Sequence, residues 1–197
     1  MLGCAVPLTV VLSTIGLIGL TVSFYHEYGS VVSISEILLS QPPWLHSIYS
    51  TVVIGTAVVL NAAFTTSTVP KTRMARVNVA SFYGALWAMQ TVFVVTYRDS
   101  LYLHFLAAAV FYASATTHIV LSYIANRRWI AGIALGLMIC ALVSMLAGCL
   151  SFYEYPRVDR RPPFVAGELT GAAAFLLHTL TISAVRASPT TLYRPHG

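Results

Sequence analysis

The sequence predicts an all-α membrane protein, a bundle of six transmembrane helices with both termini cytosolic. Of its 197 residues, 57% are hydrophobic and 9% are charged, whereas a soluble domain of this size needs far more charge on its surface. Six apolar runs follow one another along the chain, and each approaches or exceeds the about 20 residues that cross a bilayer as a helix. The cations gather in short clusters between these runs.

The six predicted spans are separated by short polar connections. The first run has no basic residue before it and no clear small-x-small cleavage site, so we interpret it as a retained helix and not as a signal peptide. Residues 1–186 then form a single transmembrane domain, and residues 187–197 form a short cytosolic tail. The spans are residues 5–25, 44–65, 77–97, 101–123, 130–152 and 164–185.

Charge in the connections predicts the orientation. Six spans place both termini on one side, and the connections before the third and fifth spans open on that same side. The positive-inside rule makes this side cytosolic, because it holds Lys71, Arg73, Arg76, Arg127 and Arg128. Three arginines fall on the opposite side against the rule, namely Arg157, Arg160 and Arg161.

The sequence also argues against several classes of function. A formal charge of +5 is no nucleic-acid signal here, since the cations lie where they set membrane orientation. The chain holds no dinucleotide fingerprint, phosphate loop or zinc-ligand pair of cysteines, so we expect no nucleic-acid partner and no metal site. Cys140 and Cys149 lie within one apolar run, and we interpret them as small core residues.

Polar side chains form an outer tier near the non-cytosolic end of the fourth and sixth spans. His104 and Glu168 each lie about one turn inside that end, and an ionisable group in a membrane span is a functional hypothesis by default. A histidine and a carboxylate can share a proton and act as general base or acid. We predict these two as catalytic, with His46 and Asp99 at the same end as substrate-binding residues. The alternative is that His104 is interfacial and Glu168 only bonds a neighbouring helix.

An inner tier lies deeper in the same two spans. His118 and His178 each lie about two turns short of the arginines that follow them, so they share a depth if the helices are neighbours. We predict both as substrate-binding residues. Two alternatives remain open: structural histidines bonded across helices, and the axial ligands of a b-type haem.

Short motifs in the connections and spans point to a known family. Residues 34–36 (Ile-Ser-Glu), the prolines 42–43 and the Leu-Tyr pair 192–193 are similar to the damage-regulated autophagy modulators. The spacing of His104 and His118, and a sixth span with an early Glu and a late His, resemble the post-GPI-attachment-to-proteins factors more closely. Taken end to end, the chain resembles the superfamily that contains both, whose members have six helices and cytosolic ends.

This resemblance implies lipid remodelling of GPI anchors in the Golgi membrane. In that role an unsaturated sn-2 acyl chain is exchanged for a saturated one, the substrates are GPI-anchored proteins, and acyl-CoA or a phospholipid is the candidate acyl donor, with no other cofactor. If the chain catalyses the step itself, it is an acyltransferase. The alternatives are a non-enzymatic lysosomal or endosomal protein like the autophagy modulators, a membrane scaffold, and a b-haem electron carrier. The oligomeric state stays open.

Overall fold

The structure is a computed structural model, and it is helical throughout the part of the chain that it describes. No strand occurs in those residues. They are residues 33, 34, 36, 72–96, 98–126, 129–150 and 161–187. The predicted first and second spans, residues 5–25 and 44–65, lie outside them.

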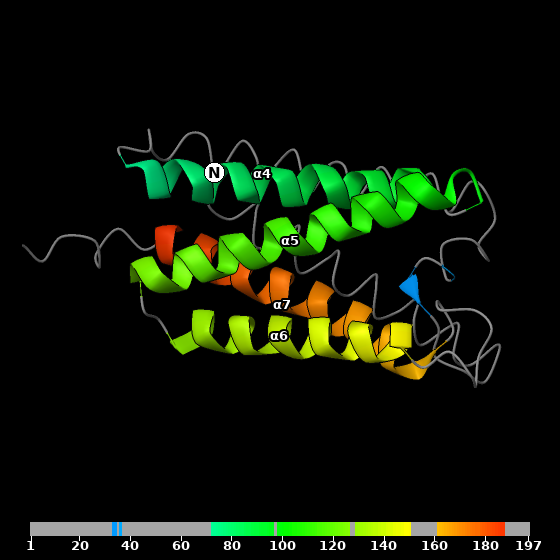
Figure 1. Cartoon of the computed structure of the whole chain (residues 1–197). Coiled ribbons are helices and arrows are strands. Elements are labelled where there is room, and N and C mark those ends of the chain that lie inside the picture. Colours follow the sequence, from blue (N-terminus) through cyan, green and yellow to red (C-terminus); the bar gives the residue numbers. More distant parts are fainter. Residues whose placement is uncertain are drawn as a thin grey trace, which may run out of the picture.

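Four long helices make up this part (Figure 1). Three of them, α4, α5 as far as Ala125, and α6, are long and apolar enough to cross a membrane. Three helices that could cross a membrane therefore agree with the predicted third, fourth and fifth spans, whereas a membrane-spanning α7, the six spans and the side of the termini stay predictions. The helices are α4 (Arg73–Val94), α5 (Leu101–Asn126), α6 (Trp129–Leu150) and α7 (Pro162–Ala187).

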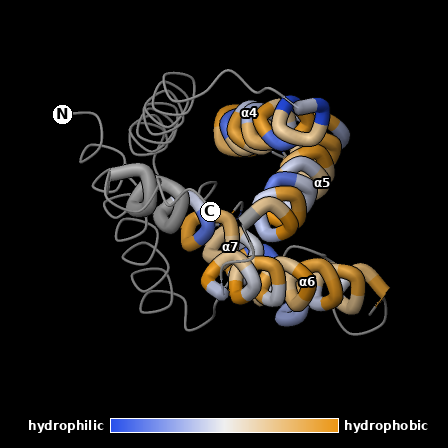
Figure 2. The backbone as a smooth tube through the Cα atoms, turned by 90° about the vertical axis from the view of Figure 1, so that its left-hand side faces the viewer, coloured by the Kyte–Doolittle hydropathy of each residue, from blue (hydrophilic) through white to orange (hydrophobic). Residues whose placement is uncertain are grey.

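The four helices lie side by side, and consecutive ones run in opposite directions (Figure 1). The most extensive contacts are between α4 and α5 and between α6 and α7, and α5 also touches both members of the second pair. Figure 2, which views the bundle along its length, shows α5 and α7 between α4 and α6. Because α5 and α7 run in the same direction, their first turns lie at the same end of the bundle.

Local signals explain where the helices begin. Thr72 caps α4, since its hydroxyl accepts a hydrogen bond from the N–H of Ala75 at 3.1 Å. Ser100 caps α5 in the same way, through the N–H of Leu103 at 3.3 Å. Pro162 opens α7, where a missing N–H costs nothing. These caps start α4 and α7 a few residues earlier than their apolar runs predict.

Small residues let α7 approach its neighbours closely. A Cβ on Gly167 would lie 2.6 Å from the carbonyl oxygen of Ala141 on α6, and a Cβ on Gly171 would enter the ring of Tyr112 on α5. The Gly-x-x-x-Gly step of α7 thus lies at two helix contacts. In α6, by contrast, a Cβ on Gly136 would meet nothing within 4 Å.

Arg161 explains one exception to the positive-inside rule. Its side chain is only 3% exposed, and its Nη1 donates to the carbonyl oxygens of Gly148 at 2.8 Å and Cys149 at 3.2 Å. These carbonyls belong to the last turn of α6, where no intrahelical N–H reaches them. A cation there also complements the helix dipole, so Arg161 serves as a C-cap of α6.

The outer surfaces of the helices are largely apolar. Large hydrophobic side chains such as Trp87 on α4 and Val143 on α6 are exposed, and long stretches of both helices are hydrophobic in Figure 2. Such faces suit contact with lipid tails. The interpretation of Cys140 and Cys149 as core residues is wrong, because both are exposed on α6. That run is apolar on every side, so its sequence does not reveal which face is buried.

Candidate functional site

His104 is a buried imidazole held by the turn between α4 and α5. Its side chain is 5% exposed, and its Nδ1 lies 2.8 Å from the carbonyl oxygen of Val95. A carbonyl can only accept, so Nδ1 carries the proton and donates it to this bond. In the neutral ring, Nε2 is then the nitrogen with the lone pair, which is the form that a general base requires.

Asp99 orders the turn that holds His104. Its Oδ2 accepts hydrogen bonds from the N–H of Thr96 at 2.9 Å and from the Thr96 hydroxyl at 2.7 Å. The N–H groups of Asp99 and Ser100 in turn donate to the Thr96 carbonyl. Asp99 itself is exposed. Asp99, predicted as a substrate-binding residue, therefore fixes the backbone next to Val95. Its carboxylate lies at the end of the bundle.

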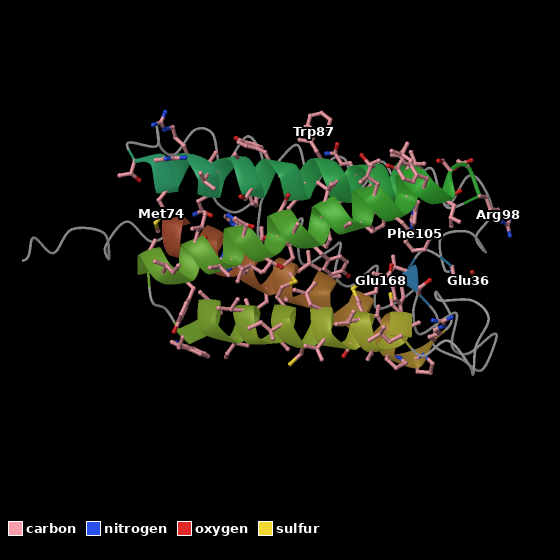
Figure 3. The ribbon with its side chains drawn as sticks, viewed as in Figure 1. Glu36, Met74, Trp87, Arg98, Phe105 and Glu168 are labelled. Atoms are coloured by element: carbon pink, nitrogen blue, oxygen red, sulfur yellow. The ribbon has the colours of Figure 1, made fainter. Side chains whose placement is uncertain are left out.

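Glu168 joins three segments at the same end. Its Oε2 accepts a hydrogen bond from the N–H of Ile34 at 3.0 Å, and its backbone carbonyl accepts one from the Tyr112 hydroxyl of α5 at 3.3 Å. Ser33 and Ile34 are buried. Figure 3 shows Glu168 at the end of the bundle where Glu36 and Phe105, the neighbour of His104, also lie. The Glu168 carboxylate of α7 thus holds the backbone of a segment that is distant in the sequence.

The two predicted catalytic residues share an end of the bundle. His104 is the fourth residue of α5 and Glu168 the seventh of α7, and these helices run in the same direction. The group that orients the His104 ring through Nδ1 is the Val95 carbonyl. His46, the remaining outer-tier residue, lies outside the described residues.

The inner tier comes together in the structure. The rings of His118 on α5 and His178 on α7 are in contact, with centroids 5.1 Å apart and planes at 75°. Both are buried, at 0% and 2% exposure. Nδ1 of His118 donates to the carbonyl oxygen of Asn78 on α4 at 3.2 Å, and Phe82 packs on the same ring. The predicted equal depth of these two histidines is confirmed.

This packing does not fit a haem between the two histidines. A bis-histidine haem has the porphyrin plane between its two axial rings. Here the rings touch each other directly, and the surrounding space is filled by the core, including Phe82 and Phe175. A porphyrin would require α5 and α7 to separate.

Several polar groups of the site were not predicted from the sequence. Asn78 donates through Nδ2 to the Ser122 hydroxyl at 3.2 Å, linking α4 to α5 beside the inner tier. The position of Asn78, a polar residue near the start of an apolar run, could have marked it as a candidate site residue. The carbonyl of Val95 and the hydroxyl of Tyr112 gave no such signal, because a backbone carbonyl is common to every residue and tyrosine is frequent at membrane interfaces.

Comparisons with known proteins do not assign the chain to a family. No protein-family model matches it, and no curated protein or solved structure matches it significantly. Among the described residues, no group of three or more His, Cys, Asp or Glu side chains could hold a metal ion. The family resemblance therefore stays a prediction, and the function has to be argued from the residues themselves.

Proposed function

We propose that this protein remodels the lipid of GPI anchors in the Golgi membrane, by placing a saturated acyl chain on the sn-2 hydroxyl. The main support is His104, buried at one end of the bundle with Nδ1 bonded to the Val95 carbonyl and the lone pair on Nε2. A ring fixed in this tautomer is arranged as a general base. GPI as the substrate is taken from the resemblance of the fourth and sixth spans.

The proposal needs the end with His104 to be non-cytosolic, where the glycerol and phosphate of a GPI anchor lie. Six spans with cytosolic termini have this consequence, and the alternating directions of α4 to α7 agree with it. The exposed Arg73 and Arg76 at the start of α4 then face the cytosol. In sealed Golgi vesicles, added protease digests tags on the cytosolic side and leaves luminal tags intact. We therefore expect tags on both termini to be digested. Protection of either tag would contradict this topology.

The proposed chemistry uses one proton and one ester exchange. Nε2 of His104 removes the proton of the sn-2 hydroxyl while that oxygen attacks the carbonyl carbon of the acyl donor. The new ester bond forms, the bond from the acyl group to its thiol or alcohol breaks, and His104 returns the proton to the leaving group. The Val95 carbonyl keeps the ring oriented during both transfers.

The other predicted site residues have supporting roles in this proposal. Glu168 holds the backbone of Ile34 at the same end, and Asp99 fixes the turn. His118 and His178 lie far from the reacting ester, since fourteen residues of α5 (118 minus 104) span about 21 Å. As substrate-binding residues they would meet only the far part of an acyl chain.

A cellular experiment tests the function itself. In cells that lack their own sn-2 remodelling, we expect this chain to restore saturated sn-2 chains on a GPI-anchored reporter, measured by mass spectrometry of the released lipid. An empty vector provides the baseline, and a tagged copy must co-localise with Golgi markers. An unchanged reporter lipid, with the protein made and present in the Golgi, would exclude the function.

One set of observations favours a second, non-enzymatic function. The hydrogen bonds described for His104, Asp99 and Glu168 include several to the protein backbone, as expected for groups that hold a bundle together. The protein would then act as a scaffold through its cytosolic face, at an endosome or lysosome. In that case, replacing Arg73 and Arg76 by glutamine should abolish its cellular effect, and replacing His104 by asparagine should not.

A further inference from the structure

His178 is a buried imidazole whose ring nitrogens make no hydrogen bond within the described residues. Its side chain is 2% exposed, and in the part of the chain that the structure describes neither Nδ1 nor Nε2 has a partner. A histidine in water has a pKa of about 6.5, so its charge changes within the pH range of cellular compartments. The surroundings of this ring therefore decide how the bundle responds to acid.

The shell around His178 is apolar apart from a second imidazole. The ring of His118 on α5 is in contact with it, with centroids 5.1 Å apart. Phe82 of α4 packs on the His118 ring, and Phe175 of α7 packs on Phe82. A neutral ring fits such a shell, because burying a charge without compensation is far more costly than burying a neutral group.

The sequence places no carboxylate at the depth of His178. The nearest acid along α7 is Glu168, ten residues earlier (178 minus 168), or about 15 Å along the helix. The other five of the six acidic residues lie in the connections between the apolar runs, at Glu27, Glu36, Asp99, Glu154 and Asp159.

The titratable groups of the neighbouring helices also supply no counter-ion. On α5, Tyr112 bonds the Glu168 carbonyl and the ring of Tyr123 lies beside Gly132 of α6. On α4, Tyr83 packs edge-on against Phe82. α6 contains no Asp, Glu, Lys, Arg or His, and its two cysteines are exposed.

The charged groups towards the same end of the bundle are cations. The predicted first and second spans contain no Asp, Glu, Lys or Arg, and their Tyr25, His46 and Tyr49 come at the opposite, outer ends. A proton on His178 would therefore meet only positive groups. These are Arg73 and Arg76 of α4, Arg127 and Arg128 of the connection between α5 and α6, and Arg186 of α7.

We propose that protonation of His178 separates α5 from α7 at the inner tier, so that the bundle opens as the pH falls. In the closed bundle the ring is neutral, whereas in the separated state it reaches water and takes up a proton. The closed state then binds fewer protons, and acid favours the open state. With a pKa of about 6.5 for the ring in water, a change from pH 7.5 to pH 5 shifts this equilibrium by up to about 30-fold.

The same interface connects the inner tier to the outer end. α5 and α7 also meet where Phe111 packs on Phe175, with centroids 5.5 Å apart, and where the Tyr112 hydroxyl donates to the Glu168 carbonyl. Separation of the helices would loosen these contacts, and with them the end that holds the proposed site. The device does not depend on the proposed lipid chemistry, because the distance between the helices can be measured without a substrate.

The test measures the distance between α5 and α7 in the purified full-length protein in lipid nanodiscs. The three cysteines are replaced by serine, and spin labels are attached at Ala113→Cys and Ala173→Cys, two exposed positions that each lie five residues before a histidine of the inner tier. We expect pulsed electron paramagnetic resonance to show a longer distance at pH 5 that is absent at pH 7.5 and disappears when the pH is restored. One unchanged distance at both pH values overturns the proposal.

Apolar substitutions identify the responsible histidine. His178→Leu and the ring-shaped His178→Phe suit the apolar shell, and both should keep the short distance at pH 5. His104→Asn is the matched control, because it removes the other buried histidine of the outer half of α5, and it should keep the response to acid. A longer distance at pH 5 in both apolar variants, or loss of the response in His104→Asn, contradicts the role of His178.

Discussion

His104→Asn is expected to reduce sn-2 reacylation by about 10²–10⁴-fold, the usual contribution of a general base. Asparagine is the informative replacement because its side-chain N–H can take the place of Nδ1 and donate to the Val95 carbonyl, which in the parent lies 2.8 Å from Nδ1. The hydrogen bond to the turn is kept, and the basic nitrogen is lost. The measurement is the rate at which saturated sn-2 chains appear on a GPI-anchored reporter.

The same variant distinguishes a catalytic from a structural histidine. If His104 only holds the α4–α5 turn, His104→Asn should work as well as the parent while His104→Ala fails. Phe105→Leu is a matched control, since Phe105 is the exposed neighbour of His104 on α5. Full activity of the asparagine variant would remove the base from the mechanism.

Gly167→Ala is expected to have the largest effect on stability among small changes. The added Cβ would lie 2.6 Å from the Ala141 carbonyl oxygen and 2.8 Å from the Met145 backbone nitrogen. Backbone atoms cannot rotate away, so α6 and α7 must move apart. Overpacking of this kind costs typically about 1–3 kcal/mol. The unfolding temperature in detergent, followed by loss of the monodisperse chromatographic peak, should fall clearly.

Gly136→Ala is the matched control in the neighbouring helix. A Cβ there meets nothing within 4 Å, and alanine is better than glycine inside a helix by roughly 0.5–1 kcal/mol. Its unfolding temperature should therefore stay the same or rise. A larger loss in Gly136→Ala than in Gly167→Ala would mean that the α6–α7 contact is not the close one.

The helices themselves were predictable because the bilayer imposes a long apolar run on every span. Each of α4 to α7 coincides with a predicted span to within a few residues at either end. The remaining differences come from capping at the helix ends. The Thr72 hydroxyl accepts a hydrogen bond from the N–H of Ala75, so α4 begins inside the basic segment. A hydrophobicity pattern does not detect such a cap.

The partners of the site residues were much less predictable. The depth of His118 and His178 followed from counting residues, and their contact confirms it. One partner of His104, the acceptor of its Nδ1 proton, is a backbone carbonyl nine residues earlier, which no pattern of side chains can reveal. Arg161 looked like a loop cation, although it is buried against the last carbonyls of α6. Such contacts depend on tertiary packing.

The most direct test of the central claim is acyl transfer by the purified protein. A synthetic GPI lipid with a free sn-2 hydroxyl is incubated with a saturated acyl-CoA or a phospholipid donor, and mass spectrometry follows the diacyl product. We predict that the parent protein forms the sn-2 ester and that His104→Asn, folded to the same unfolding temperature, forms it at least about 100-fold more slowly. Absence of product with both donors, or equal rates for the two proteins, would contradict a catalytic role for His104.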